Sequence, residues 1–505
     1  MRRVLFVMTV LAGLVTATVP AAADPLVVRT DAGAVRGFAA GPVMRFDGIP
    51  YAKPPVGDLR WTSPRRPEHW SGVRDATAPG PRCAQARVPG IGTAPSYDED
   101  CLYLNVTAPR AAKRKPVLVW IHGGGLVNGD GAFYDTTRLA AQGDVVVVTI
   151  NYRLGVFGLL AHPELGVAGG NFGLEDQTAA LRWVQHNIRA FGGDPGNVTV
   201  AGESGGAFST CALLASPSTV GLIDKAILES GTCSVYFPKN SVFPGVGEAR
   251  LVAPRAETEQ IGVATAAQVG CATLECLRKI KVEQWVDSLL VNNTAQLSYH
   301  TRFLPVDPVG HARPVPMIVG SNRDELRLFA AFAVQFGVPF DDASVRRLFD
   351  DTYGEDAEAV RARYPIGDGP HAAAVAWARA TTDQGFACRT LADARTYRGP
   401  VYAYEFADPN PPMISGGPTV PDFPFGAYHG SELLSLFWEP PGNAAQQELA
   451  GQMVRYWTRF AHTGDPNGPG LPTWPRFDGN TVQSLKPGAV GPIDADEQHQ
   501  CGFWL

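Results

Sequence analysis

One five-residue segment, 202–206 (GESGG), constrains the fold of this chain more than any other. It follows the apolar run 198–201 and precedes a helix-compatible stretch, 207–214. A serine on such a sharp strand-to-helix turn has a strained backbone, and glycine neighbours let the strand and helix approach closely. The pattern therefore predicts a serine nucleophile, Ser204, on an elbow. The alternative is chance, because the chain has 55 glycines.

A glycine loop follows a second apolar run upstream. Residues 117–121 are typical of a strand buried on both faces, and HGGG follows at 122–125. Backbone N–H groups there would stabilise the charge on an ester carbonyl oxygen, each worth roughly 100- to 1000-fold in rate. A flexible turn or a phosphate loop is the alternative, but Leu-Val stands at 126–127 where a phosphate loop needs Lys-Ser or Lys-Thr. The donors we expect are the N–H groups of Gly124, Gly125 and Gly205.

A serine nucleophile needs an imidazole to take its proton and a carboxylate to orient the imidazole. On an elbow of this kind the acid and then the histidine follow the serine, each after a later strand. Residues 317–320 indicate a short buried strand, and a polar loop with Asp324 and Glu325 follows it. His429 lies in a later loop rich in glycine and aromatic residues. These patterns do not rank the two acids, and they leave three other histidines as candidates: His300, His311 and His371.

Further motifs resemble those of the type-B carboxylesterases, the α/β-hydrolase family that also contains the cholinesterases and para-nitrobenzyl esterases. Besides the elbow and the glycine loop, they are 99–106 (EDCLYLNV), 151–155 (NYRLG), 191–195 (FGGDP) and 464–467 (GDPN). The resemblance extends from about residue 25 to the C-terminus. It implies an α/β-hydrolase fold, with a large, mostly parallel central sheet, flanking helices and long loop insertions.

The resemblance also assigns site residues. The family acid is the glutamate of an Asp-Glu pair, which maps to Glu325, and the family histidine precedes a glycine, which maps to His429. Leu326 departs from the family, which usually has glycine there. Glu203 matches a family carboxylate that would either stabilise the imidazolium or anchor neighbouring loops. Ser230 resembles a position that supports the triad.

Composition indicates a large globular enzyme. With 45% hydrophobic and 18% charged residues, the chain can bury a sizeable core. A net charge of −6 and the lack of an extended basic run argue against nucleic-acid binding. Because the triad candidates span 204–429, we expect one α/β domain over 24–505. Zinc or calcium ligand spacing is missing from the sequence, so we expect no metal and no other cofactor.

The first 23 residues are typical of a secretory signal peptide. Arg2 and Arg3 precede an apolar segment, 4–19, and three alanines at 21–23 offer a cleavage site before Asp24. That segment is shorter than the roughly 20 residues a spanning helix needs. We therefore expect cleavage and export, without stable membrane insertion.

Export to an oxidising compartment favours disulfides among the eight cysteines. The resemblance implies three pairs, and the fourth follows only by elimination. The four pairs are Cys83 with Cys101, Cys271 with Cys276, Cys388 with Cys501, and Cys211 with Cys233.

These features together predict an exported serine carboxylesterase that hydrolyses small-molecule esters, with short to medium acyl chains, through an acyl-enzyme. Because the base must be neutral, activity should rise with pH near the ordinary histidine value of about 6.5. The loop 83–101 lacks the tryptophan that binds quaternary ammonium in cholinesterases, so a choline-ester specialist is not expected. The alternatives are a lipase, a transacylase, or a non-catalytic adhesion or binding protein on the same fold. The natural ester and the oligomeric state stay open.

Overall fold

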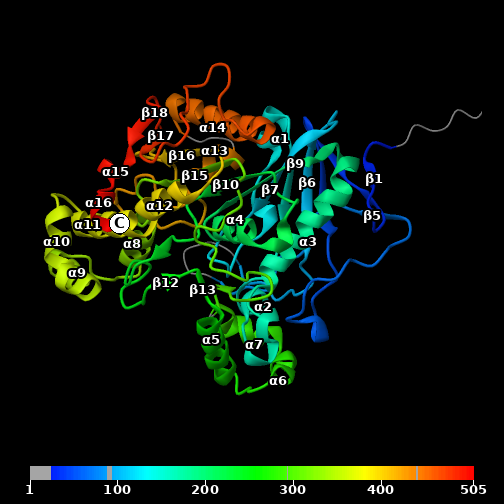
Figure 1. The fold of residues 1–505 in the computed structure, drawn as a ribbon, viewed down its shortest axis with the longest axis horizontal. Coiled ribbons are helices and arrows are strands. Elements are labelled where there is room, and N and C mark those ends of the chain that lie inside the picture. Colours follow the sequence, from blue (N-terminus) through cyan, green and yellow to red (C-terminus); the bar gives the residue numbers. More distant parts are fainter. Residues whose placement is uncertain (1–23, 88–93, 293, 439–441) are drawn as a thin grey trace, which may run out of the picture.

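The computed structural model describes residues 24–87, 94–292, 294–438 and 442–505. The predicted signal peptide, 1–23, therefore lies outside the described residues. Figure 1 shows a large twisted sheet through the middle of the molecule, with helices packed against it and further helices beyond its edges.

The central sheet has 11 strands in the order β18-β17-β16-β15-β10-β9-β7-β8-β6-β4-β3. Its middle is parallel and its two edges are antiparallel, so the sheet is mixed and mostly parallel, as predicted. The parallel strands are β7 (Lys115–Ile121), β8 (Val146–Ile150), β9 (Gly193–Glu203), β10 (Lys225–Glu229), β15 (Met317–Asn322), β16 (Val401–Phe406) and β17 (Thr481–Leu485). The antiparallel strands are β3 (Phe38–Ala40), β4 (Val43–Pro50), β6 (Tyr103–Pro109) and β18 (Gly491–Asp494).

Alternate residues of the parallel strands pack on opposite faces, because successive side chains of a strand point to opposite sides of the sheet. In β7, Val117, Val119 and Ile121 belong to a core shared with α3 (Phe172–Asn187) and α4 (Gly205–Ala215). The residues between them, Leu118 and Trp120, belong to a second core. The helices that contribute to this second core are α1 (Thr137–Gly143), α13 (Leu433–Phe437) and α14 (Ala444–Thr463). Burial on both faces explains why β7 is a continuous apolar run.

Smaller elements surround this core. In Figure 1, helices α5–α7 lie at the bottom of the view and α9–α11 at its left. The remaining α-helices are α2 (Gly155–Leu159), α5 (Arg255–Gln268), α6 (Leu274–Lys279), α7 (Val282–Asp287), α8 (Arg327–Gln335), α9 (Asp342–Tyr353), α10 (Ala357–Arg363), α11 (Ala372–Thr382), α12 (Cys388–Thr396), α15 (Ala495–Gln498) and α16 (Cys501–Trp504). The remaining strands are β1 (Val27–Arg29), β2 (Ala34–Arg36), β5 (Val73–Asp75), β11 (Tyr236–Phe237), β12 (Ala249–Arg250), β13 (Val252–Pro254) and β14 (Leu297–Tyr299).

The strand expected at 317–320 is two residues longer than its apolar run. Ser321 and Asn322 still pair with β16, opposite Glu405 and Phe406, so β15 ends at Asn322. Main-chain pairing does not require apolar side chains, which is why the pattern ended early. The predicted polar loop therefore starts at Arg323.

Four disulfides join all eight cysteines in the pairs expected from the sequence. Cys211 and Cys233, paired only by elimination, are among them. Within the described ranges, the structure contains no helix long and apolar enough to span a bilayer. A single domain over 24–505 stays a prediction.

Candidate active site

Ser204 occupies the predicted elbow between the last residue of β9 and the first of α4. Its backbone has φ 52° and ψ −121°, a conformation that costs energy for any residue other than glycine. The Ser204 N–H donates to the Glu229 carbonyl of β10 at 2.9 Å, which anchors the elbow to the sheet. At Gly206, a Cβ would lie 1.9 Å from the Ile121 carbonyl of β7. Only glycine therefore allows α4 to approach the sheet this closely.

The structure brings His429 and Glu325 together from loops 104 residues apart. His429 Nδ1 lies 2.6 Å from Glu325 Oε2, and the Asn322 N–H donates to the other carboxylate oxygen at 2.7 Å. Glu325 is fully buried, and 10% of the His429 side chain is exposed. When Nδ1–H donates to Glu325, the proton-free nitrogen is Nε2, as a general base requires.

Asp324, the other candidate acid, has a different set of partners. Its carboxylate pairs with Arg323 and Arg327 at 2.8 and 2.7 Å and accepts the Ala427 N–H at 2.9 Å. The Asp324 N–H in turn donates to the Ala427 carbonyl at 3.0 Å. Asp324 thus joins the acid loop to the histidine loop.

The three other candidate histidines lie elsewhere. His300 and His311 are exposed. His371 Nε2 lies 3.0 Å from the Pro421 carbonyl. Within the described part of the chain, no ion pair joins any of the three to Asp324 or Glu325.

Glu203 faces the same imidazole nitrogen that would accept the serine proton. Its Oε1 lies 3.3 Å from His429 Nε2 and makes no hydrogen bond within the described residues. This favours charge stabilisation over loop anchoring. Also within the described residues, no hydrogen bond joins Ser204 Oγ to His429.

The buried carboxylates change the pKa of the imidazole. Burial raises the pKa of Glu203 to about 7, with Glu325 adding to the effect and His429 opposing it. Burial alone would lower the pKa of His429, but the charges of Glu203 and Glu325 raise it to about 9. If His429 is the base, such a pKa would move the rise of activity from about pH 6.5 to higher pH.

The three expected oxyanion donors lie around the elbow. A Cβ on Gly205 would lie 3.2 Å from the Gly125 nitrogen and 2.9 Å from the Leu126 nitrogen. Gly124 has φ +100°, and a Cβ there would lie 2.3 Å from the Asn128 carbonyl. Within the described residues, no hydrogen bond occupies the N–H of Gly124 or Gly125. Both N–H groups are therefore without an acceptor among the described residues, and their oxyanion role stays a prediction.

Two buried glutamates near the triad had not been expected as site residues. Glu229 accepts a hydrogen bond from Trp457 Nε1 at 2.8 Å, and burial raises its pKa to about 8. Glu432 is hydrogen-bonded to Asn322 Nδ2. Burial and the charges of neighbouring glutamates raise the pKa of Glu432 well above its usual value. The signal available in the sequence was a single acid within each of two short runs, 226–230 (AILES) and 431–434 (SELL).

Ser230 lies close to the elbow, next to Gly231. It is fully buried with φ 52°, its N–H donates to the Gly320 carbonyl at 2.9 Å, and a Cβ on neighbouring Gly231 would lie 2.9 Å from the Ser204 carbonyl. Ser230 Oγ has no hydrogen-bond partner within the described residues. Its support of the triad stays a prediction.

An aromatic wall, Phe237, Phe329 and Phe386, adjoins the imidazole. The rings of Phe329 and Phe386 are each centred 5.7 Å from the His429 ring. Phe237 lies 5.5 and 5.3 Å from these two rings. The wall is apolar and suits a hydrocarbon chain of a substrate.

In the part of the chain that the structure describes, no group of three or more histidine, cysteine or acidic side chains could hold a metal ion. The site instead combines a strained serine, a carboxylate-bound imidazole and free backbone donors. Such a set can carry out acyl transfer.

Comparison with known proteins gives a consistent result. The carboxylesterase family model matches residues 24–504. The medium-chain fatty acyl-CoA hydrolase precursor of Anas platyrhynchos is 36% identical, covering 92% of this chain and 88% of the relative. The fumonisin B1 esterase of Sphingopyxis macrogoltabida is 36% identical, covering 90% and 85%. The para-nitrobenzyl esterase of Bacillus subtilis (strain 168) is 34% identical, covering 91% and 94%. A solved PNB esterase structure superposes with a TM-score of 0.77 and 31% identity, covering 95% of this chain and 100% of the other.

Proposed function

Since this chain belongs to the carboxylesterase family and is a carboxylic ester hydrolase, we propose that it works through an acyl-enzyme on Ser204. Ser204 Oγ attacks the ester carbonyl while His429 Nε2 takes its proton, and Glu325 orients the imidazole and stabilises its charge. His429 then gives the proton to the departing alcohol. Water attacks the acyl-enzyme by the same steps, which releases the acid and restores Ser204.

The observation that carries this proposal is the 2.6 Å contact between His429 Nδ1 and Glu325 Oε2. The described structure does not contain the hydrogen bond from Ser204 to His429 that the mechanism needs. Such bonds are often long in a free enzyme and tighten once substrate binds. The carbonyl oxygen would meanwhile accept from the N–H groups of Gly124, Gly125 and Gly205.

The proposed substrates are small esters with short to medium acyl chains. The aromatic wall beside His429 supports an apolar chain in the site. The names of two relatives, a medium-chain fatty acyl-CoA hydrolase and a para-nitrobenzyl esterase, fit substrates of this size. We also propose that Glu203 stabilises the imidazolium and that Ser230 supports the triad.

The proposed mature protein is a single domain over 24–505, exported after cleavage of residues 1–23. Four disulfides support an oxidising compartment, since such bonds are rare in the cytosol. We expect neither a nucleic-acid partner nor stable membrane insertion after signal cleavage.

A chain-length series of p-nitrophenyl esters tests this function, with the mature protein and its Ser204→Ala variant. We expect turnover by the wild type and essentially none by the variant, with the preferred chain length indicating the size of the acyl site. Turnover by Ser204→Ala would refute the serine mechanism.

Long-chain triglycerides test for a lipase, and ester products formed with an added alcohol test for a transacylase. A folded protein that neither cleaves the esters nor reacts with an organophosphate would support the binding-protein alternative.

A further inference from the structure

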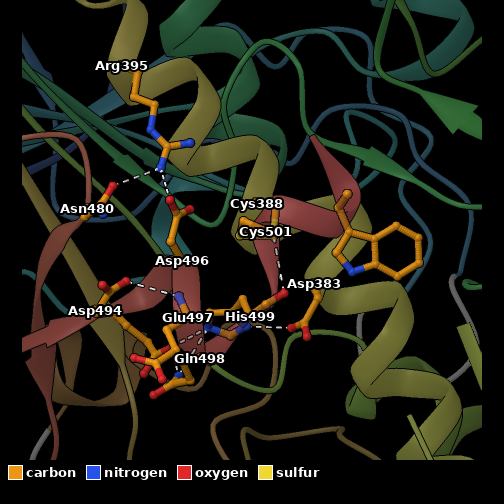
Figure 2. The surroundings of a disulfide bond; sticks show 12 residues. Asp383, Cys388, Arg395, Asn480, Asp494, Asp496, Glu497, Gln498, His499 and Cys501 are labelled. Carbon is orange, nitrogen blue, oxygen red and sulfur yellow. Dashed lines mark hydrogen bonds and ion pairs between the residues drawn. A yellow bond between two sulfur atoms is a disulfide. The ribbon is translucent and has the colours of Figure 1, made fainter. Parts of the chain in front are cut away.

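A buried ion cluster lies at the C-terminal end of the chain, away from the triad. Its centre is His499, between α15 and α16, and Figure 2 shows the ring directed at Asp383. His499 Nδ1 lies 2.5 Å from Asp383 Oδ1, and Nε2 lies 2.5 Å from Glu405 Oε2. All three side chains are buried.

The geometry favours a positively charged imidazole. Both ring nitrogens face carboxylate oxygens, and only an imidazolium donates a hydrogen bond from each. A neutral ring would direct one lone pair at a buried carboxylate, which is costly. The remaining donors are neutral: the Tyr364 hydroxyl donates to Asp383 at 2.9 Å, and the Gln498 amide donates to Glu405 at 2.6 Å.

An ion pair and a disulfide from the C-terminal residues hold the two ends of one short turn. This is the π-helical turn Asp383–Ala387, which joins α11 to α12. His499 binds Asp383 at its start, and the Cys388–Cys501 disulfide holds the residue directly after its end (Figure 2). Between these anchors lies Phe386, the member of the aromatic wall whose ring is 5.7 Å from the His429 ring.

The residue before the turn contacts the acid loop. Thr382 Oγ1 accepts the N–H of Leu326 at 3.0 Å, and Leu326 directly follows Glu325. The segment 382–386 therefore contacts both the imidazole and the loop that carries its carboxylate. Turns of this π-helical kind are rare and often occur at functional positions.

We propose that His499 is a positioning residue of the active site: bonded to Asp383 and Glu405, it holds the segment 382–386 so that Phe386 and Thr382 keep His429 and Glu325 aligned. This inference rests on the proposed function, in which His429 is the base. A displacement of about 1 Å in such a site costs on the order of 100-fold in rate. The effect of losing His499 should therefore fall on the chemical step.

The test is His499→Gln in the full mature chain, assayed on a short p-nitrophenyl ester. We expect kcat to fall by about 10- to 100-fold, with a smaller change in KM and a shift of the pH dependence of kcat/KM. Asp496→Ala is the matched control. It removes the ion pair between the tail and Arg395, 2.5 Å apart, without contact to Asp383, so it should leave kcat and the pH profile unchanged.

A folded His499→Gln protein with wild-type kcat and pH profile would overturn the proposal and leave His499 a purely structural anchor. If that variant does not fold, Glu405→Gln takes its place, because it keeps the Asp383 contact and the disulfide. It should also lower kcat, though by less, because the His499 ring loses the second carboxylate that fixes its position. An unchanged kcat would equally overturn the proposal.

A second variant tests the route through the aromatic contact. Phe386→Leu should lower kcat, and His499→Gln added to it should cost less than it does alone. Fully additive losses would contradict that route. If the proposed function itself were wrong, a different result would show it: His429→Ala would retain activity.

Discussion

Two adjacent acids, Asp324 and Glu325, contact different parts of the molecule. Asp324 binds two arginines and the Ala427 N–H, so it joins two loops. Glu325 instead contacts the His429 imidazole. In the proposed mechanism, Asp324 therefore has a structural role and Glu325 a catalytic one, because the two side chains have different partners.

Glu325→Gln should therefore lower kcat far more than Asp324→Asn. The glutamine removes the charge that stabilises the imidazolium, for which we expect a loss of about 1000- to 10,000-fold. Asp324→Asn should retain most activity but lower the free energy of unfolding by about 1–3 kcal/mol, through weaker charged hydrogen bonds. Steady-state kinetics and urea denaturation of both variants measure this. An Asp324→Asn variant as inactive as Glu325→Gln would contradict the assignment.

Glu203 should control the pH at which activity appears. With Glu203 and Glu325 nearby, the pKa of His429 is about 9, and activity requires the neutral imidazole. Activity therefore rises as pH increases through that pKa. Glu203→Gln removes one negative charge, which lowers the pKa and moves the rise to lower pH. The kcat/KM of wild type and variant from pH 5 to 10 measures this. An unchanged or more alkaline profile in the variant would refute the role.

Residues in contiguous strings could be predicted from the sequence, and isolated residues could not. Ser204 and the glycine loop are parts of short motifs that specify a backbone shape. Asn322, which donates to Glu325, is one polar residue at the end of a buried strand and has no distinguishing pattern. The displaced pKa of His429 depends on acids more than 100 residues away from it in one case and over 200 in the other. An ordinary histidine value was the only expectation the sequence allowed.

At the level of elements, the contact between the elbow and β7 is one of the closest backbone approaches in the described structure. Gly206→Ala would place a methyl group 1.9 Å from the Ile121 carbonyl, so we expect a poorly folded, inactive protein. Gly451→Ala in α14 is the contrasting change, since no atom outside the adjoining helix backbone lies within 4 Å of the added carbon. It should stabilise the helix by about 0.5–1 kcal/mol. Thermal melts of both variants measure this, and a well-folded, active Gly206→Ala would contradict the described elbow.

Elements buried on both faces were predictable, and edge elements were not. β7, β9 and β15 contain apolar runs that identify them as strands of a parallel sheet. The edge strand β3 has only three residues, too few to show a period, and β18 has four with no buried residue. Such edge strands form where their main-chain groups can hydrogen-bond to a neighbouring strand, and the side-chain pattern does not show which strand that is.

At the scale of the whole molecule, the Cys388–Cys501 disulfide joins the C-terminal tail to the body across 113 residues. Replacing both cysteines with alanine should lower the free energy of unfolding by about 5 kcal/mol in the chain-entropy picture. The Cys271–Cys276 bridge spans only 5 residues, and its loss should cost about 2 kcal/mol. Guanidinium denaturation of both double variants measures the difference. A larger loss for the short bridge would contradict this account of the tail.

The central claim is that the ester is cleaved through a covalent acyl group on Ser204. The most direct test is rapid mixing with a p-nitrophenyl ester, acid quenching and mass spectrometry of the peptide that contains residues 202–206. We predict a burst of p-nitrophenol close to one equivalent and an acyl group on Ser204, with neither in Ser204→Ala. An acyl group on another residue, or a burst that persists in Ser204→Ala, would contradict the account.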